Sequence, residues 1–191
     1  MNQAWSELNK TMQAQIKKKD TCEAGIDTLF DLRNQLMETL TSFSEELSRE
    51  EFDAIPFINA DGYHSKTIAY SIWHIFRIED IVAHTLIGED EQVFFAGNYQ
   101  ERINSPIITT GNELVKEQIA DFSKQLNLKE LYAYIFEVKD STEKIIDSLS
   151  YDDLKKKISE ERKEYLKSLN VVSNDENAIW LIDYWCGKDI R

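Results

Sequence analysis

The sequence predicts an all-α protein, a four-helix bundle with extra short helices that forms one domain over residues 1–191. Only two prolines and six glycines occur in the chain, and these are the residues that most disfavour helix. Several segments repeat apolar side chains every three or four residues, which is typical of amphipathic helices. Apolar stripes of this kind are buried together most simply in a bundle.

Three long helices follow from this spacing. The first is predicted over residues 27–49, and residues 1–26 form either an N-terminal extension or the start of that helix. The second is predicted over residues 65–88 and the third over residues 127–149. In each segment the apolar side chains share one face, as Leu29, Leu32, Leu36, Leu40, Phe43 and Leu47 do in the first.

Capping boxes predict where three helices begin. In this motif a small polar residue and an acid three positions later bind the first free N–H groups of a helix. The sequence offers Asn127 with Glu130, Thr110 with Glu113, and Ser173 with Glu176.

The segments between the long helices are expected to be loops and short helices. Residues 55–61 are predicted to be a loop, because proline and asparagine occur there and a glycine follows. Residues 94–111 are predicted to be a long ordered loop, which in compact domains is often functional. A shorter helical piece is expected over residues 152–169, with the lysines at 155–157 in solvent.

The terminal helix, predicted over residues 178–185, is apolar nearly all round, with Asp183 the exception. Such a helix must be buried, so part of its surface is expected to pack on a second copy in a homodimer. Cys186 follows it and is expected to be a buried, inert thiol.

Charge and cysteine content narrow the classes of partner. The formal net charge is −13, which argues against nucleic-acid binding and against attraction to an anionic membrane surface. No apolar run is long enough to span a bilayer, and the first residues do not resemble a secretory signal. The two cysteines, Cys22 and Cys186, are too few for a disulfide scaffold, so the cytoplasm is the expected compartment.

The three histidines, His64, His74 and His84, are the obvious candidates for metal binding. His74 and His84 share one predicted helix, and the ten residues between them correspond to about 15 Å of rise. They therefore cannot bind the same ion, because Zn–N bonds are about 2 Å long. His84 is expected at the surface or rim. His74 has apolar neighbours on its face and is expected to be partly buried, either as a core histidine or as a ligand or general base lining a cavity.

Five stretches of the sequence, taken together, resemble the DinB-like superfamily. The main one is residues 67–80, TIAYSIWHIFRIED, which is similar to the second-helix signature of that superfamily. The others, in the same order along the chain, are GEDEQVF at 88–94, RIN at 102–104, TGN at 110–112 and WLIDYW at 180–185.

The resemblance implies a DinB-like four-helix bundle, commonly dimeric, with a divalent metal such as zinc or nickel bound by three histidines. One of these lies on the second helix, where His74 matches it, and two lie near the end of the chain. Relatives of this kind include metal-dependent transferases that use low-molecular-weight thiols, and isomerases. This chain departs from that pattern, because it has no histidine after His84.

Two functions follow and stay open at this point. The resemblance implies a metal-dependent thiol transferase or hydrolase-type enzyme. In it His74 binds the metal, and the substrate, such as a small thiol, lies near residues 94–111. The missing histidine pair favours the alternative, a non-catalytic dimeric bundle that binds a small molecule or a protein partner.

Overall fold

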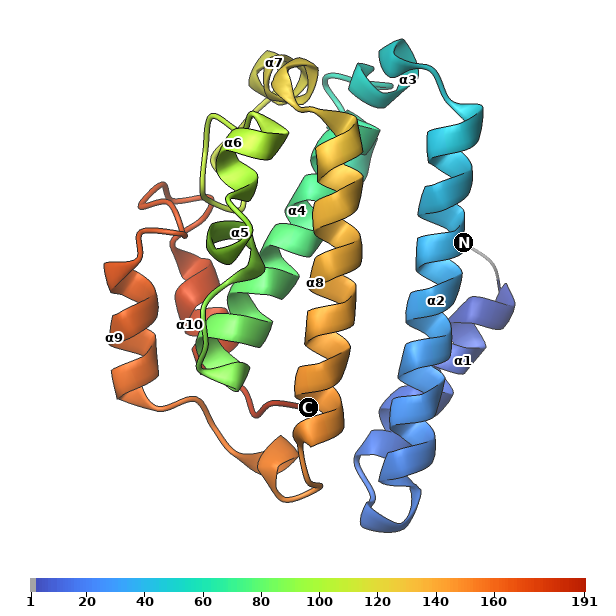
Figure 1. The fold of residues 1–191 in the computed structure, drawn as a ribbon, viewed down its shortest axis with the longest axis vertical. Coiled ribbons are helices and arrows are strands. Elements are labelled where there is room, and N and C mark those ends of the chain that lie inside the picture. Colours follow the sequence, from blue (N-terminus) through green and yellow to red (C-terminus); the bar gives the residue numbers. More distant parts are fainter. Residues whose placement is uncertain (1–2) are drawn as a thin grey trace.

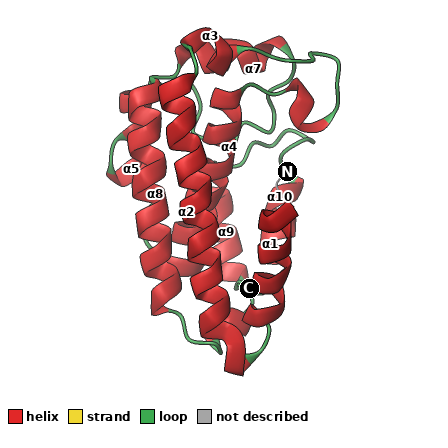
Figure 2. Ribbon diagram, turned by 90° about the vertical axis from the view of Figure 1, so that its right-hand side faces the viewer, coloured by secondary structure: helices red, strands yellow, loops and turns green. Residues whose placement is uncertain are grey.

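The long helices of the chain lie side by side (Figure 1). The computed structural model describes residues 3–191, apart from the side chain of Tyr63. At its centre are α2 (Cys22–Glu46), α4 (Ile68–Asp80) and α8 (Leu128–Ser148), and α1 (Gln3–Ile16) packs along α2. Within the described residues the chain is helical throughout and forms no strand beyond one isolated bridge (Figure 2), which confirms the all-α class.

The hairpin of α1 and α2 differs from the prediction at its start. Residues 3–16 form a helix of their own, and a turn with the 3₁₀ segment η1 (Lys19–Thr21) leads into α2, which begins five residues before the predicted start at 27. The first two residues of the predicted extension lie outside the described part. Gly25 permits the close approach of the two helices, because a Cβ there would lie 2.8 Å from the backbone nitrogen of Ile16. No residue of α1 is fully buried, so this helix lies over the bundle as a cover.

The second long helix is confirmed in extent but changes its geometry. Thr67 caps α4 by accepting a hydrogen bond from the amide of Tyr70 (3.0 Å). From residue 81 onward the chain continues as the π-helix η3 (Ile81–Gly88), and Glu89 ends it in the left-handed region at φ 59°. Hydrophobic spacing does not distinguish a π-helical stretch from an α-helical one, and π-helical turns are found frequently at functional sites.

Residues 94–111, predicted as one loop, contain most of α5 (Val93–Ala96) and all of α6 (Tyr99–Ile103). That prediction was wrong in part, because the two short helices pack their buried residues against α8. The loop prediction for residues 55–61 is confirmed; it lies between α3 (Arg49–Asp53) and the 3₁₀ turn η2 (Gly62–Ser65).

Of the three predicted helix caps, only the one at Asn127 is confirmed, by its side chain accepting from the amide of Glu130. The pair at Thr110 is wrong: the hydroxyls of Thr109 and Thr110 bond to Glu113 and Asn112 within the loop, and α7 (Glu117–Gln125) starts later. Short polar side chains serve turns as readily as helix starts, which explains the failure.

The chain ends in short helices. The 3₁₀ turn η4 (Asp153–Lys155) and α9 (Glu160–Ser168) fall within the piece predicted over residues 152–169. The cap predicted at Ser173 is wrong, because its hydroxyl closes a turn with Asp175 and α10 (Trp180–Cys186) begins later. Within the chain the terminal helix is buried on one face only, and the packing of its other face on a second copy stays a prediction. Leu181 and Ile182 are buried, whereas Trp180 and Tyr184 are 50% and 51% exposed.

Two clusters of buried side chains make up the interior. One lies towards the end of the molecule that carries α3 and α7, at the top of Figure 1, and we call it the apical core; its largest members are aromatic. They are Phe52, Tyr70, Trp73, Phe76, Phe94, Tyr99, Phe122 and Tyr134. The other cluster is aliphatic and joins η3 to α9 and α10. None of the described helices has the length and apolar character needed to cross a membrane.

Candidate functional site

His74 lies at the edge of the apical core and is partly buried, as predicted. Its ring stacks on Tyr70, with centroids 5.4 Å apart, and its Nδ1 lies 2.8 Å from the carbonyl oxygen of Thr110. Burial lowers the pKa of His74 below its ordinary value, although the hydrogen bond to Thr110 opposes this shift. The imidazole is therefore neutral near pH 7, donates through Nδ1 and presents Nε2 as its basic nitrogen.

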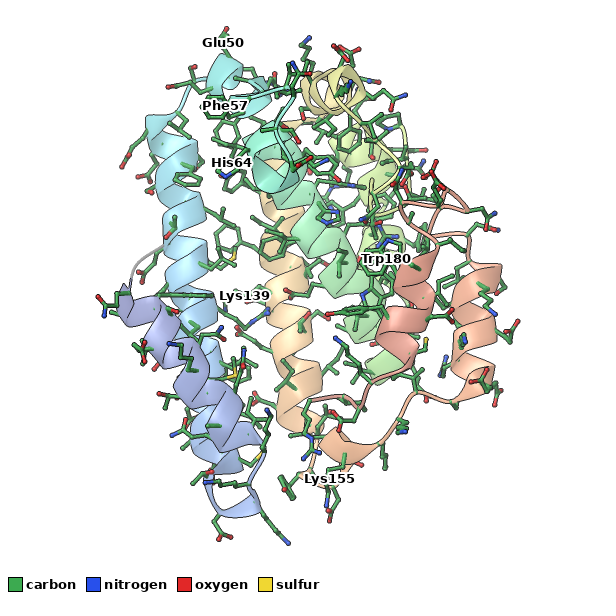
Figure 3. The ribbon with its side chains drawn as sticks, turned by 180° about the vertical axis from the view of Figure 1, so that it is seen from behind. Glu50, Phe57, His64, Lys139, Lys155 and Trp180 are labelled. Atoms are coloured by element: carbon green, nitrogen blue, oxygen red, sulfur yellow. The ribbon has the colours of Figure 1, made fainter. Side chains whose placement is uncertain are left out.

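His84 is buried, so its predicted place at the surface or rim is wrong. Only 3% of the residue is exposed, and it lies in the π-helix η3, most of whose residues are buried. Its Nδ1 lies 2.7 Å from Oδ1 of Asp90, and its Nε2 has no hydrogen-bond partner among the described residues. His64, by contrast, is exposed at the apical end beside Phe57 (Figure 3).

Asp80 holds together a buried polar network at the end of α4. Its carboxylate accepts hydrogen bonds from the amides of Val93 and Phe94 (2.8 and 3.0 Å), from Tyr134 Oη (2.8 Å) and from Arg77 (3.2 Å). Burial raises the pKa of Asp80, and the neighbouring Arg77 guanidinium opposes that rise. The network is closed on all sides by protein atoms, and we interpret it as the structural link between α4, α5 and α8.

The side chains around His74 do not provide the three protein ligands of a metal site. Glu113 is near enough to raise the pKa of His74, and no other metal-ligating side chain has this effect. Across residues 3–191, no group of three or more histidine, cysteine, aspartate or glutamate side chains is arranged to bind a metal ion. Catalytic zinc sites use three protein ligands, so the described residues do not fit the metal centre that the resemblance implies.

A cavity of about 690 Å³ opens in the other half of the molecule, between α1, α2, η3 and the end of α8. We call it the basal cavity, because it lies towards the end of the molecule opposite to the apical core. Its wall is mainly aliphatic, with Ile16, Leu29, Ile78, Val82, Ile145 and Leu149 among the lining side chains. Ligand pockets in proteins typically measure about 300–1,000 Å³ and are lined in this way.

Thr142 brings a buried hydroxyl to the wall of this cavity. The residue is 6% exposed, and its Oγ1 has no hydrogen-bond partner within the described part of the chain. Threonine in a helix normally bonds back to the carbonyl one turn earlier. An unsatisfied buried hydroxyl costs about 1–3 kcal/mol, and a molecule in the cavity would relieve this cost.

An ion-pair network limits the basal cavity on its apical side. Glu79 lines the cavity and is held by both terminal nitrogens of Arg33, at 2.7 and 3.1 Å. Arg33 also binds Glu143 (3.1 Å), which in turn binds Lys139 (2.8 Å). Figure 3 shows Lys139 between the two ends of the molecule.

The sequence did not reveal the lining residues of the basal cavity. Isoleucine and valine on an amphipathic face have the same pattern whether they fill a core or line a space. The predicted substrate position near residues 94–111 differs from this one, since no residue of that segment lines the basal cavity. Cys186 is half-buried and burial raises its pKa, which agrees with the expected unreactive thiol.

No family model matches this chain, and no curated protein sequence matches it either. The resemblance to the DinB-like superfamily therefore rests on the sequence motifs alone and stays a prediction.

Proposed function

We propose that the chain is a non-catalytic helical bundle of the DinB-like type that binds an apolar small molecule in the basal cavity. The observation that carries this proposal is the cavity itself, with its aliphatic wall and the unpartnered Thr142 hydroxyl. Protein interiors are normally packed to the density of organic crystals. The space beneath α1 is partly open to solvent, so its aliphatic wall meets water unless a ligand covers it.

The position of α1 supports entry of a ligand. Met12 and Ile16 of α1 line the cavity, yet no residue of this helix is fully buried. Its packing is mainly with α2. A helix with few buried apolar contacts opens at lower free energy than the core of the same protein, so α1 is the element that would admit the ligand.

The test is a titration with Nile red, a neutral dye that fluoresces in apolar sites. We expect saturable binding at one site and weaker binding to Val82→Phe, whose ring would occupy the cavity. The expected weakening is about tenfold or more, which corresponds to about 1.4 kcal/mol. The matched control is Val115→Phe, because Val115 is 49% exposed and does not line the cavity. Equal binding by both variants, each verified as folded by circular dichroism, would contradict the proposal.

The enzyme function is supported by one observation only, the neutral imidazole of His74 with its free basic nitrogen. A metal-dependent thiol transferase would need further ligands from outside the described residues. Calorimetric titration with zinc and nickel tests this function. One equivalent bound by the native chain and none by His74→Ala would favour the enzyme, whereas no binding by either would favour the binding protein.

The homodimer is proposed from the outer face of α10. Ile179, Trp180 and Tyr184 expose large apolar surfaces next to one another along the chain. Aromatic side chains of this type are enriched at protein interfaces. Light scattering of the native chain and of Trp180→Ser tests this interface: a dimer that the substitution converts to a monomer is expected, and a monomeric native chain would contradict it.

A further inference from the structure

We propose that the ligand of the basal cavity is an amphipathic anion, a carboxylate on an aliphatic chain, whose chain fills the cavity and whose carboxylate lies at the basal end. This inference rests on the proposed function, because it names the class of small molecule that the cavity binds. Three observations support it: the lysines gathered at the basal end, the two cations that line the cavity, and the carboxylate at the opposite side of the cavity.

The basal end gathers six lysines, with Asp20, Asp152, Asp153 and Asp189 among them. Two loops carry its lysines, residues 17–19 before α2 and residues 155–157 after α8, and all six are exposed. The loops are joined by a hydrogen bond of 2.9 Å from Tyr151 Oη to the carbonyl of Lys17, and Figure 3 shows Lys155 at this end. Because the whole chain has a charge of −13, this local accumulation of lysines distinguishes the basal end from the rest of the surface.

Lys17 and Arg191 belong to the wall of the cavity itself. Arg191 is paired with Asp189 (3.1 Å), and Lys155 and Lys156 are paired with Asp152 and Asp153. Lys17 takes part in no ion pair between the described residues. Its ammonium group is therefore the cation available to a carboxylate at the entrance, while its methylene stem covers apolar surface.

The opposite side of the cavity determines the orientation of the ligand. Glu79 lies there, and Arg33 already occupies both of its oxygens. A second carboxylate next to Glu79 would be repelled and would lose its hydration. The aliphatic chain is therefore directed inward, along Leu29, Val82 and Ile145, and the charged group remains in contact with water beside Lys17.

The experiment is displacement of Nile red by decanoate, dodecanoate and tetradecanoate and by their methyl esters, below their micellar concentrations. We expect binding to strengthen about fourfold for each added methylene, as expected for about 0.8 kcal/mol per buried group. Each carboxylate is expected to bind about threefold to tenfold more tightly than its ester, the gain that one or two exposed ion pairs supply. Added salt should reduce only the preference for the carboxylate.

The matched variants are Lys17→Met, directly after the end of α1, and Lys10→Met, within α1. Lys10 is exposed and does not line the cavity, so its replacement should change nothing. Lys17→Met should remove most of the preference for the carboxylate and leave ester binding intact. Dye and ester binding without any preference for the carboxylate would overturn this inference and leave the proposed function standing. No binding of dye, ester or carboxylate would overturn both.

Discussion

The apical core and the basal cavity occupy opposite halves of the same three helical segments, yet one is filled and the other is hollow. Towards the apical end α4 and α8 contribute Trp73, Phe76 and Tyr134. The ring of Trp73 packs edge to face against Phe94 and Phe122, and that of Tyr134 against Phe94. Towards the basal end η3 and α8 contribute aliphatic side chains that leave a space of about 690 Å³.

The difference follows from side-chain size and from the position of α1. Aromatic rings reach across the centre of a bundle, whereas isoleucine and valine extend only a short distance from the backbone. In the basal half α1 lies over the gap without burying any residue fully. Two regions with the same helical pattern thus differ in role: one supplies stability and the other supplies space. The predictions below test this division.

The largest effect is expected at the polar network beneath the apical core. Asp80→Asn removes one charge of a fully buried pair and leaves Arg77 uncompensated. We expect a loss of about 3–5 kcal/mol in the free energy of unfolding, measured by urea denaturation. Asp152→Asn is the control, because this carboxylate is exposed and its replacement should leave the free energy of unfolding nearly unchanged. A loss below about 1 kcal/mol for Asp80→Asn would show that this network is not central to stability.

The same substitution at two alanines compares the regions directly. Ala69 is fully buried in the apical core, and Ala83 lines the basal cavity. Ala69→Leu should destabilise the fold by about 1–3 kcal/mol through overpacking. Ala83→Leu should be neutral or stabilise it by about 0.5–2 kcal/mol, because the added atoms enter existing space. Thermal unfolding of both variants is the measurement, and equal destabilisation would indicate that the cavity is closed in solution.

Two threonines on these helices test the unpartnered hydroxyl. Thr85 accepts a hydrogen bond of 2.7 Å from Gln92, whereas Thr142 has no partner within residues 3–191. Thr85→Val should cost about 1–3 kcal/mol, because it leaves Gln92 unsatisfied. Thr142→Val should leave stability unchanged or slightly increased. A loss for Thr142→Val similar to that for Thr85→Val, in urea denaturation, would show that the Thr142 hydroxyl is satisfied by ordered water.

The smallest effect concerns the edge of the apical core and depends on pH. Burial lowers the pKa of His74 in the folded chain below its ordinary value of 6.5. Between the lowered pKa and the ordinary pKa, the unfolded chain therefore binds more protons than the folded chain. The contribution of His74 to the free energy of unfolding is therefore fully present above about pH 6.5. It decreases as the pH falls towards the pKa of His74 in the folded chain. His74→Gln keeps a donor for Thr110 and should lose less stability than the native chain between about pH 7.5 and about pH 5.5. Parallel urea denaturation curves at both pH values measure this difference, and an identical pH dependence would contradict it.

The success of the sequence predictions varies from helix to helix for physical reasons. The helix over residues 127–149 was predicted almost completely, because its apolar stripe and the Asn127 cap are both local signals. The partly buried position of His74 was predicted from its neighbours on one helical face. His84 was misplaced because α8 and α9 enclose η3 and bury most of its residues, and such tertiary packing leaves no local signal in the sequence.

By itself the sequence determined the helical class and the three long amphipathic segments, because both depend on residues close together in the chain. Only the tertiary structure decided which half of these segments is filled and which is hollow. Cavities depend on how far side chains from distant segments reach towards one another, as Ile16, Val82 and Ile145 do here. The meeting of the lysines at 17–19 with those at 155–157 likewise depends on a contact between loops separated by the whole bundle, the hydrogen bond from Tyr151 to Lys17.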